Sequence, residues 1–334
     1  KRGIARWLQR AERGLRHLWS LGLALGLVWR EWPDIVHVAE MLFVPDALLS
    51  ICPRRSRVVH TCHNVERFAY TRSGSLTYSS RLWRRVRLLF YRRCAGIIFH
   101  TPQNLQEFRQ IYGFEPTQSA IIPHGEYRLF DAGVALTPQE ARRRLGLRVD
   151  GACVLFFGFI RRYKGLDTLI EAMGRLCRTM AEVRLLVAGS PGRDVDLEAL
   201  QERAAELELA DRVTWHTEYV PLDRVHLYFA ACDVVALPYR KVYDSGVLKI
   251  AQALGRPAVV TDVGGLASSV EDGGAALVVP PENPAALAEA LRRLLAEPGL
   301  ADRLARRGQE LARSRYSWER VAEQTEGFYW EVRE

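Results

Sequence analysis

Three cationic side chains crowd the loop that follows an apolar run at residues 153–157. The run CVLFF is followed by Gly158, and then by Arg161, Arg162 and Lys164. An amphipathic helical pattern begins directly after them. A helix N-terminus carries unpaired N–H groups and a partial positive charge, and arginine and lysine beside it favour a bound anion. The loop therefore predicts a site for a phosphate or diphosphate, with a solvated basic turn as the alternative.

Two further glycine-containing loops also follow apolar runs. AGSPGR at 188–193 follows one, and LPYRKVYDSGVLKIAQALGRP at 237–257 contains the other. Asp244 or Ser245 is expected to cap a helix whose first N–H groups form a second anion cradle. The chain contains no Walker A sequence and no G-x-G-x-x-G, so neither a P-loop nor a dinucleotide site is predicted.

The elements that must position these loops alternate between strand and helix. Strands are expected at 34–38, 57–61, 96–100, 119–123, 153–157, 183–188, 212–216, 233–237, 257–261 and 275–279. Helices are expected at 137–146, 165–180, 196–209, 284–297 and 313–332, among others. This alternation predicts parallel sheets covered on both faces, and 334 residues are too many for one core. The fold class is α/β, with doubly wound domains at 1–130 and 131–312 and a helical tail at 313–334.

The net charge of +8 is concentrated in the first domain. Residues 1–130 hold 20 Lys and Arg against 9 Asp and Glu, a balance of +11, and the remainder has a balance of −3. This asymmetry indicates an anionic partner for the first domain, such as a membrane surface, nucleic acid or a phosphate-bearing substrate. Nucleic acid is the least favoured of these, because the sequence contains no nucleic-acid recognition module.

Two segments of the first domain place arginine among apolar residues at helical spacing. Residues 3–19 repeat arginine every three or four positions, and in residues 79–95 Leu82, Val86 and Leu89 share one face. This pattern is typical of helices that lie on a membrane surface, and equally of helices with one face buried in the protein and one solvated face. The apolar stretch at 17–29 is too short to span a bilayer and has no signal-peptide cleavage site, so a buried or membrane-facing helix is expected.

The six cysteines are scattered and form no C-x-x-C pair, and no Cys/His set has the spacing of a zinc site. In a chain of this length the pattern predicts a reducing compartment and no bound metal.

Motifs along nearly the whole chain resemble family 4 glycosyltransferases. FFGFIRRYKGLDTLIEA, ACDVVALPYR, DSGVLKIAQALGRPAVVTDVGGL and YSWERVAEQT resemble the donor-binding half, and PDIVHVAE, HTCHNVERF, YRRCAGIIFHTPQNLQEF and IIPHGEY resemble the acceptor half. The resemblance implies the GT-B fold, in which two Rossmann-like domains face a cleft and a C-terminal helix crosses back to the first domain. It implies retaining, metal-independent transfer of a hexose from a GDP- or UDP-sugar, without a cofactor. The implied acceptor is lipid-linked or otherwise membrane-bound, which favours membrane contact for the basic helices. Together with the cysteine pattern and the basic first domain, this predicts a cytoplasmic protein peripherally attached to an anionic membrane.

The resemblance also assigns roles to single residues. Arg161 and Lys164 correspond to the diphosphate pair and His63 to the histidine that reaches the donor sugar, while Arg162 is expected to face solvent or act as a spare. His124 and Glu126 are candidates for the cleft, and the remaining histidines at strand ends, His60 and His100, are expected to be packing residues. The expected donor-binding residues are Gly158, Gly189, Glu218, Tyr219, Asp244, Ser245, Gly246, Val247, Leu248 and Lys249.

The sequence departs from the family pattern at several positions. Val242 and Ile250 stand where many relatives have glutamates for the donor sugar and the ribose, with Asp244 as a stand-in for the first. Phe159 stands where many relatives have an arginine, and the family's first strand and glycine-rich loop do not match the start of this chain. Two other functions stay open. One is a sugar-nucleotide 2-epimerase of the same fold, which needs acid/base carboxylates in the cleft, and few are evident here. The other, because the two glutamates are missing, is a non-catalytic nucleotide-sugar-binding partner of another transferase.

Overall fold

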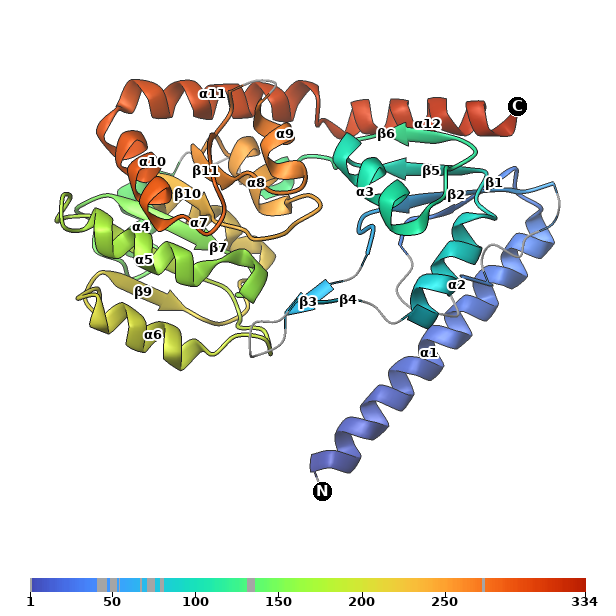
Figure 1. Cartoon of the computed structure of the whole chain (residues 1–334), viewed down its shortest axis with the longest axis horizontal. Helices are drawn as coiled ribbons and strands as arrows, with labels where there is room; N and C mark the ends of the chain where they lie inside the picture. Colours follow the sequence, from blue (N-terminus) through green and yellow to red (C-terminus); the bar gives the residue numbers. More distant parts are fainter. Residues whose placement is uncertain are drawn as a thin grey trace. The chain divides into compact units, whose positions relative to one another are not determined.

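A computed structural model gives the fold of the chain (Figure 1). It describes residues 2–40, 47–48, 53, 55–66, 68–70, 76–78, 81–130, 136–271 and 274–334. The chain divides into two compact units, which we describe one at a time. Unit 1 comprises residues 1–67, 79–122 and 322–334, and unit 2 comprises residues 68–78 and 123–321.

Unit 2 is built on a six-stranded parallel sheet in the order β12-β11-β10-β7-β8-β9. Its strands are β7 (Cys153–Phe157), β8 (Arg184–Ala188), β9 (Val213–His216), β10 (Val234–Leu237), β11 (Ala258–Thr261) and β12 (Leu277–Val279). The order runs outward from β7 in one direction and from β10 in the other. The topological switch point therefore lies between β7 and β10, where open parallel sheets bind their ligands.

Helices cover both faces of this sheet (Figure 1). Because strand side chains alternate between faces, Leu155 and Phe157 of β7 pack with α4, α7, α8 and α9, whereas Val154 and Phe156 pack with α5, α6 and α10. The unit is thus doubly wound, as the alternation of elements predicts. Its helices are α4 (Pro138–Arg144), α5 (Leu166–Leu176), α6 (Leu197–Glu206), α7 (Val225–Ala231), α8 (Gly246–Ala253), α9 (Gly265–Glu271), α10 (Pro284–Ala296) and α11 (Pro298–Ser314).

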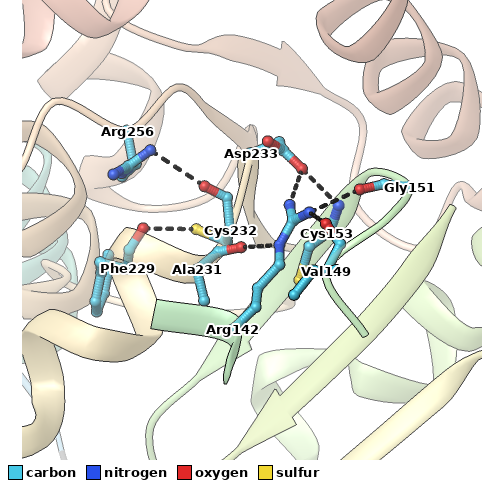
Figure 2. Close-up of polar contacts among 9 residues, drawn as sticks. All are labelled: Arg142, Val149, Gly151, Cys153, Phe229, Ala231, Cys232, Asp233 and Arg256. Carbon is cyan, nitrogen blue, oxygen red and sulfur yellow. Dashed lines mark hydrogen bonds and ion pairs between the residues drawn. The ribbon is translucent and has the colours of Figure 1, made fainter. Parts of the chain in front are cut away.

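The buried side chain of Arg142, on α4, fixes the amino ends of β7 and β10 (Figure 2). Its guanidinium donates to three backbone carbonyl oxygens, including that of Ala231, and pairs with the Asp233 carboxylate at 2.7 Å. The same carboxylate accepts the Cys153 N–H at 2.7 Å. The amino ends of β7 and β10 are therefore held by partly buried polar contacts, on the side opposite the glycine-containing loops.

Unit 1 contains a four-stranded parallel sheet in the order β1-β2-β5-β6. Gly96 on β5 lies directly under the C-terminal helix, because an added Cβ would be 2.7 Å from both Phe328 and Val332. The strands are β1 (Ile35–Val38), β2 (Arg57–Cys62), β5 (Gly96–Phe99) and β6 (Ser119–Ile121). The helices are α1 (Arg2–Glu31), α2 (Arg81–Tyr91), α3 (Pro102–Tyr112) and the end of α12 (Trp318–Arg333), while the hairpin β3 (Phe68–Tyr70) and β4 (Leu76–Tyr78) belongs to unit 2.

The ten expected strands all form, with ends within two residues of the predicted ones. The expected helix at 313–332 was wrong in one respect, because α11 ends at Ser314 and α12 begins at Trp318. The break has a local cause: the Ser317 hydroxyl accepts the Arg320 N–H at 3.2 Å and so caps a new helix. The segment 123–130, expected in the first domain, packs with unit 2, where Phe130 joins the core.

Candidate functional site

The loops after β7 and β10 meet at the switch point of the unit 2 sheet. Gly165, with φ +69°, comes so close to the second loop that an added Cβ would lie 2.0 Å from the Pro238 carbonyl oxygen. The Arg240 N–H donates to the Tyr163 carbonyl oxygen at 2.7 Å. The Arg240 guanidinium binds both oxygens of Asp167, at 2.7 and 2.8 Å. These contacts join the two loops into one surface at the carboxyl edge, and the sequence analysis did not single out Arg240 as part of it.

The Lys164 ammonium lies inside this surface. Lys164 ends a short 3-10 helix and is 7% exposed, and its Nζ donates to the Phe157 carbonyl oxygen at 3.3 Å. A Cβ built on Gly158 would lie 2.8 Å from this Nζ and 3.6 Å from a methyl group of Val247. The ammonium therefore lies beside Gly158 and close to the first turn of α8, and these three predicted site residues come together.

The environment of Lys164 changes its acidity. Burial, and to a smaller extent the positive charge of Arg161, lower the pKa of Lys164 to about 8. The Nζ also lies 5.5 Å from the centroid of the Tyr239 ring, whose hydroxyl pKa is raised by burial. An anion that binds next to a buried ammonium with few compensating groups stabilises its charged form, so the site favours anion binding.

Arg161 is oriented by a carboxylate that the sequence analysis did not single out. The Nε of Arg161 lies 2.6 Å from Oδ1 of Asp194, whose side chain is 6% exposed. The other oxygen of Asp194 accepts the Arg162 N–H at 3.2 Å. Gly192 makes room for the pair, since an added Cβ would lie 2.3 Å from the Arg161 Cδ. Asp194 follows the AGSPGR loop at 188–193, so proximity to that loop was the signal available in the sequence.

The first turn of α8 supplies backbone N–H groups next to Lys164. Ser245 is buried and caps the helix, because its hydroxyl accepts the Leu248 N–H at 3.3 Å. Oδ1 of Asp244 accepts the Ser245 N–H at 2.7 Å. The N–H groups of Gly246 and Val247 belong to the first turn, where a helix offers no intrahelical acceptor. The predicted capping of this helix is confirmed, and its positive end adjoins the lysine.

The residues expected around the base lie at the same sheet edge. Gly189, with φ +139°, packs on the loop after β7, since an added Cβ would lie 2.3 Å from the Gly158 carbonyl oxygen. Its N–H donates to the His216 carbonyl oxygen at 2.8 Å. Glu218 and Tyr219 follow β9 and are exposed. Their role in holding a base remains a prediction.

Lys249 lies deeper in unit 2, as do Val242 and Ile250, the two apolar residues at the positions where many relatives have glutamates. Lys249 is 1% exposed, and its Nζ lies 3.1 Å from the centroid of the Tyr316 ring, which is a close cation–π contact. Burial lowers the pKa of Lys249 to about 8. Ile250 is buried in the core, and Val242 packs against that core. The donor role expected for Lys249 remains a prediction, and in the structure this side chain contacts Tyr316.

His124 and Glu126 lie in the segment that precedes α4. The His124 ring stacks on Tyr127 with centroids 5.5 Å apart, and Tyr127 in turn lies against Gly246, at the start of α8. Glu126 is 3% exposed, and its carboxylate accepts from the backbone N–H and the guanidinium of Arg128. His124 is thus linked to the α8 end of the site through one ring, while the Glu126 carboxylate is engaged by Arg128.

His63 lies in unit 1, at the end of β2. Its Nδ1 is 2.8 Å from Nε2 of His100, which follows β5. His60 is buried, donates from Nδ1 to the Val38 carbonyl oxygen at 2.7 Å and has a pKa lowered to about 3, mainly by burial. His60 therefore fits the packing role expected for it, whereas His100 makes a second contact that the sequence analysis did not foresee.

Both units match known protein families. Residues 2–125 match the model described as Glycosyltransferase Family 4, and residues 151–297 match the model described as Glycosyl transferases group 1. The chain is 33% identical over 240 residues to the D-inositol 3-phosphate glycosyltransferase of Acidothermus cellulolyticus, covering 70% of this chain and 52% of the relative. The protein of that name from Xylanimonas cellulosilytica is 30% identical over 304 residues, covering 87% of this chain and 70% of the relative. The chain spans about half the length of several of the curated relatives it matches.

Two solved structures illustrate the similarity in fold. The Anabaena protein HepE in complex with UDP gives a TM-score of 0.78 at 18% identity, covering 93% of this chain and 82% of HepE. Sucrose-phosphate synthase from Thermosynechococcus elongatus gives 0.73 at 23% identity, covering 90% and 73%. The chain forms two α/β units with parallel sheets, and a family model matches in each unit. One relative is 30% identical and is covered over 70% of its length. The chain belongs to the family 4, or group 1, glycosyltransferases and has their GT-B fold.

Proposed function

We propose that the protein is a retaining glycosyltransferase that moves a hexose from a nucleotide diphosphate sugar to an acceptor. The observation that carries this proposal is the Lys164 ammonium beside Gly158 and the first turn of α8, at the switch point of the sheet. When the glycosidic bond breaks, negative charge develops on the leaving diphosphate. Preorganised cations and N–H groups stabilise that charge without rearranging, and Arg161 supplies the second cation. In this mechanism these groups replace a metal ion, and His63 contacts the donor sugar.

The comparisons guide the choice of donor and acceptor. HepE was solved with UDP and with UDP-glucose, so a UDP-hexose is the first donor to test and a GDP-hexose the second. The relatives are named for D-inositol 3-phosphate, a phosphorylated polyol. We propose a membrane-bound, lipid-linked class of acceptor, because two helices of unit 1 expose apolar side chains among arginines. Both acceptors belong in the same assay.

The proposed membrane contact is supported by apolar side chains that face outward on two helices of unit 1. On α2, Leu82 and Leu89 are 69% and 63% exposed, on the same face as exposed Arg85. Bulky apolar residues among arginines are typical of helices that lie in a membrane interface. None of the helices in the described ranges is long and apolar enough to cross a membrane. Among the side chains of α1 that the structure describes, the large apolar ones that are exposed are Leu15, Leu18, Trp19, Leu23, Leu27 and Trp29.

We propose peripheral attachment through these two helices, at the cytoplasmic face of a membrane. The free thiols of Cys62, Cys94, Cys153, Cys177 and Cys232 support a reducing compartment.

The double variant Leu82→Glu, Leu89→Glu is expected to bind phosphatidylserine vesicles about tenfold more weakly or worse, because two apolar contacts with lipid are lost. Arg85→Glu should weaken vesicle binding more at low salt than at high salt. Arg84 is not suitable for charge reversal, because it pairs with the buried Glu66 at 2.9 Å. Vesicle co-sedimentation measures both effects. Leu222→Glu, on an equally exposed leucine of unit 2, is the control, and equal binding by all variants would contradict the attachment.

Donor binding is expected to weaken as pH rises. The pKa of Lys164 is about 8, and its charged form is the one that attracts a diphosphate. The charged fraction falls about tenfold between pH of about 7 and about 9, so the affinity for UDP should fall by up to that factor in calorimetric titrations. Since the pKa lies below that of an exposed lysine, the folded chain binds fewer protons there, and stability from this group rises with pH. Lys249 also has a pKa lowered to about 8 and would give the same trend in stability. A fall in affinity with pH that is lost in Lys164→Met would therefore point to Lys164, and a flat affinity profile in the wild type would contradict its role.

The proposed transfer is tested by thermal shift with UDP-, GDP- and dTDP-hexoses, followed by product analysis with the donor that stabilises. Transfer to an acceptor, with the anomeric configuration retained, is the expected result. Formation of an epimer without any acceptor would identify a sugar-nucleotide 2-epimerase instead. Stabilisation with neither transfer nor slow hydrolysis would identify a binding partner of another enzyme.

A further inference from the structure

Two histidine rings of unit 1 are joined at the carboxyl edge of its sheet. His63 follows β2 and His100 follows β5, and these strands are paired neighbours. Nε2 of His100 lies 2.8 Å from Nδ1 of His63, and the ring centroids are 4.7 Å apart. Nδ1 of His100 lies 2.9 Å from the Ile122 carbonyl oxygen. One histidine therefore contacts both a backbone carbonyl group and the other histidine.

The chemistry of these contacts places the protons. A carbonyl oxygen only accepts hydrogen bonds, so Nδ1 of His100 carries a proton. A neutral imidazole holds a single proton, which leaves Nε2 of His100 as an acceptor. Nδ1 of His63 must then donate to it, and in the neutral pair Nε2 of His63 carries a lone pair and no proton. The Ile122 carbonyl group thus determines the tautomer of His63 through His100.

A comparison within the same sheet indicates that this is more than packing. His60 also donates from Nδ1 to a carbonyl group of the adjacent strand, but its ring lies edge-on against Phe90, with centroids 5.1 Å apart. His60 is 2% exposed, whereas His63 is half-buried. His100 has the same anchor as His60 but contacts an imidazole in place of a phenyl ring. The ring it orients is the one expected to contact the sugar.

We propose that His100 is a positioning residue that fixes the tautomer of His63, so that His63 offers an unprotonated Nε2 to a hydroxyl group of the sugar substrate. The proposal rests on the proposed function, in which His63 contacts the donor sugar. It adds a requirement on the substrate: the group that meets His63 donates a hydrogen bond. A sugar hydroxyl fulfils this, and a group that only accepts does not.

Two substitutions of His100 separate its two contacts. In His100→Asn the amide takes the place of Nδ1, so the bond to the Ile122 carbonyl oxygen is kept and the acceptor for His63 is lost. In His100→Gln the amide oxygen takes the place of Nε2, so the acceptor for His63 is kept. The Asn variant is expected to lower kcat by about tenfold, the size of one lost hydrogen bond in the transition state, and the Gln variant by about threefold or less.

Two-bond ¹H–¹⁵N correlation spectra of the histidine rings report the tautomer directly, without any substrate. The wild type and the Gln variant are expected to show His63 protonated at Nδ1, and the Asn variant is expected to show a shift of the proton to Nε2. A proton on Nε2 of His63 in the wild type would overturn the inference. Equal losses of kcat in both variants, following their losses of thermal stability, would overturn it as well.

The two measurements distinguish this inference from the proposed function. If the spectra show the expected tautomer but no nucleotide sugar is turned over, the proposed function fails, and the role of the pair in catalysis fails with it. If the wild type transfers hexose and the Asn variant does so at the same rate, the proposed function stands and the positioning role of His100 is wrong.

Discussion

Replacing Lys164 by methionine is expected to lower kcat/KM for the nucleotide sugar by about 100-fold or more, the usual cost of removing one preorganised donor to a developing anion. Methionine fills a similar volume without the charge, so the loss reports the ammonium and not a cavity. The effect should be large because Lys164 is buried beside Gly158 and Val247, where water cannot replace it. The variant should also be no less stable than the wild type, since removal of a desolvated buried charge offsets the loss of the hydrogen bond to the Phe157 carbonyl oxygen.

Arg161→Met is expected to have an effect of similar size, about 100-fold, because Arg161 supplies the second cation. The neighbouring Arg162 provides the control: Arg162→Met should change kcat/KM by about twofold at most, since it is assigned no contact with the diphosphate. Initial rates at low donor concentration measure all three variants. Full activity in both Lys164→Met and Arg161→Met would rule out the assignment of the diphosphate to this loop.

The second large effect is expected at Gly165, where the two loops touch. An added Cβ would lie 2.0 Å from the Pro238 carbonyl oxygen, and φ of +69° is itself unfavourable for alanine. Gly165→Ala is therefore expected to destabilise unit 2 by about 3 kcal/mol or more, because backbone must move to relieve the clash. Separating the loops would also displace Lys164 from the first turn of α8, so donor binding should be lost before the unit unfolds.

Gly146 is a matched control for this substitution. Its φ of +68° is nearly the same, but nothing lies within 4 Å of an added Cβ. Gly146→Ala should cost about 1 kcal/mol, the price of the left-handed conformation alone. Urea unfolding of both variants, combined with UDP titration, separates strain from contact. Equal destabilisation by the two substitutions would show that the approach of the loops contributes nothing.

The positions of the strands and of the anion site follow from local features of the sequence. Apolar runs of about five residues, each followed by glycine or a polar loop, identify the buried parallel strands. The glycine and the cations after β7 mark a sheet edge, and Ser245 marks the start of α8. Each of these features depends on residues that are close together in the sequence, so a local sequence pattern is enough to predict it.

Contacts between distant segments could not be predicted in the same way. Asp194 orients Arg161 across 33 positions, and Arg240 binds Asp167 across 73. Either carboxylate is an ordinary surface residue by its type, and only the pairing of β7 with its neighbours brings the partners together. His100 was expected to be a packing residue for the same reason, since its contact with His63 depends on the register of β2 and β5.

The sequence pattern also could not predict which face of a helix is buried. Leu82, Val86 and Leu89 share a face by spacing, but spacing does not say whether that face meets the core. In the structure the buried side chains of α2 are Arg87, Phe90 and Tyr91, and the leucines point outward. The buried guanidinium of Arg87 donates from one nitrogen to the Asn64 carbonyl oxygen at 2.6 Å and lies 5.5 Å from the centroid of the Tyr91 ring.

The most direct test of the central claim is a calorimetric comparison of UDP with UMP, or of the GDP pair if the donor screen selects guanine. The second phosphate is the group assigned to Lys164, Arg161 and the first turn of α8. The wild type is expected to bind UDP at least about tenfold more tightly than UMP, and Lys164→Met should lose most of that difference while binding UMP normally. Equal binding of UDP and UMP by the wild type, or an undiminished difference in Lys164→Met, would contradict the account.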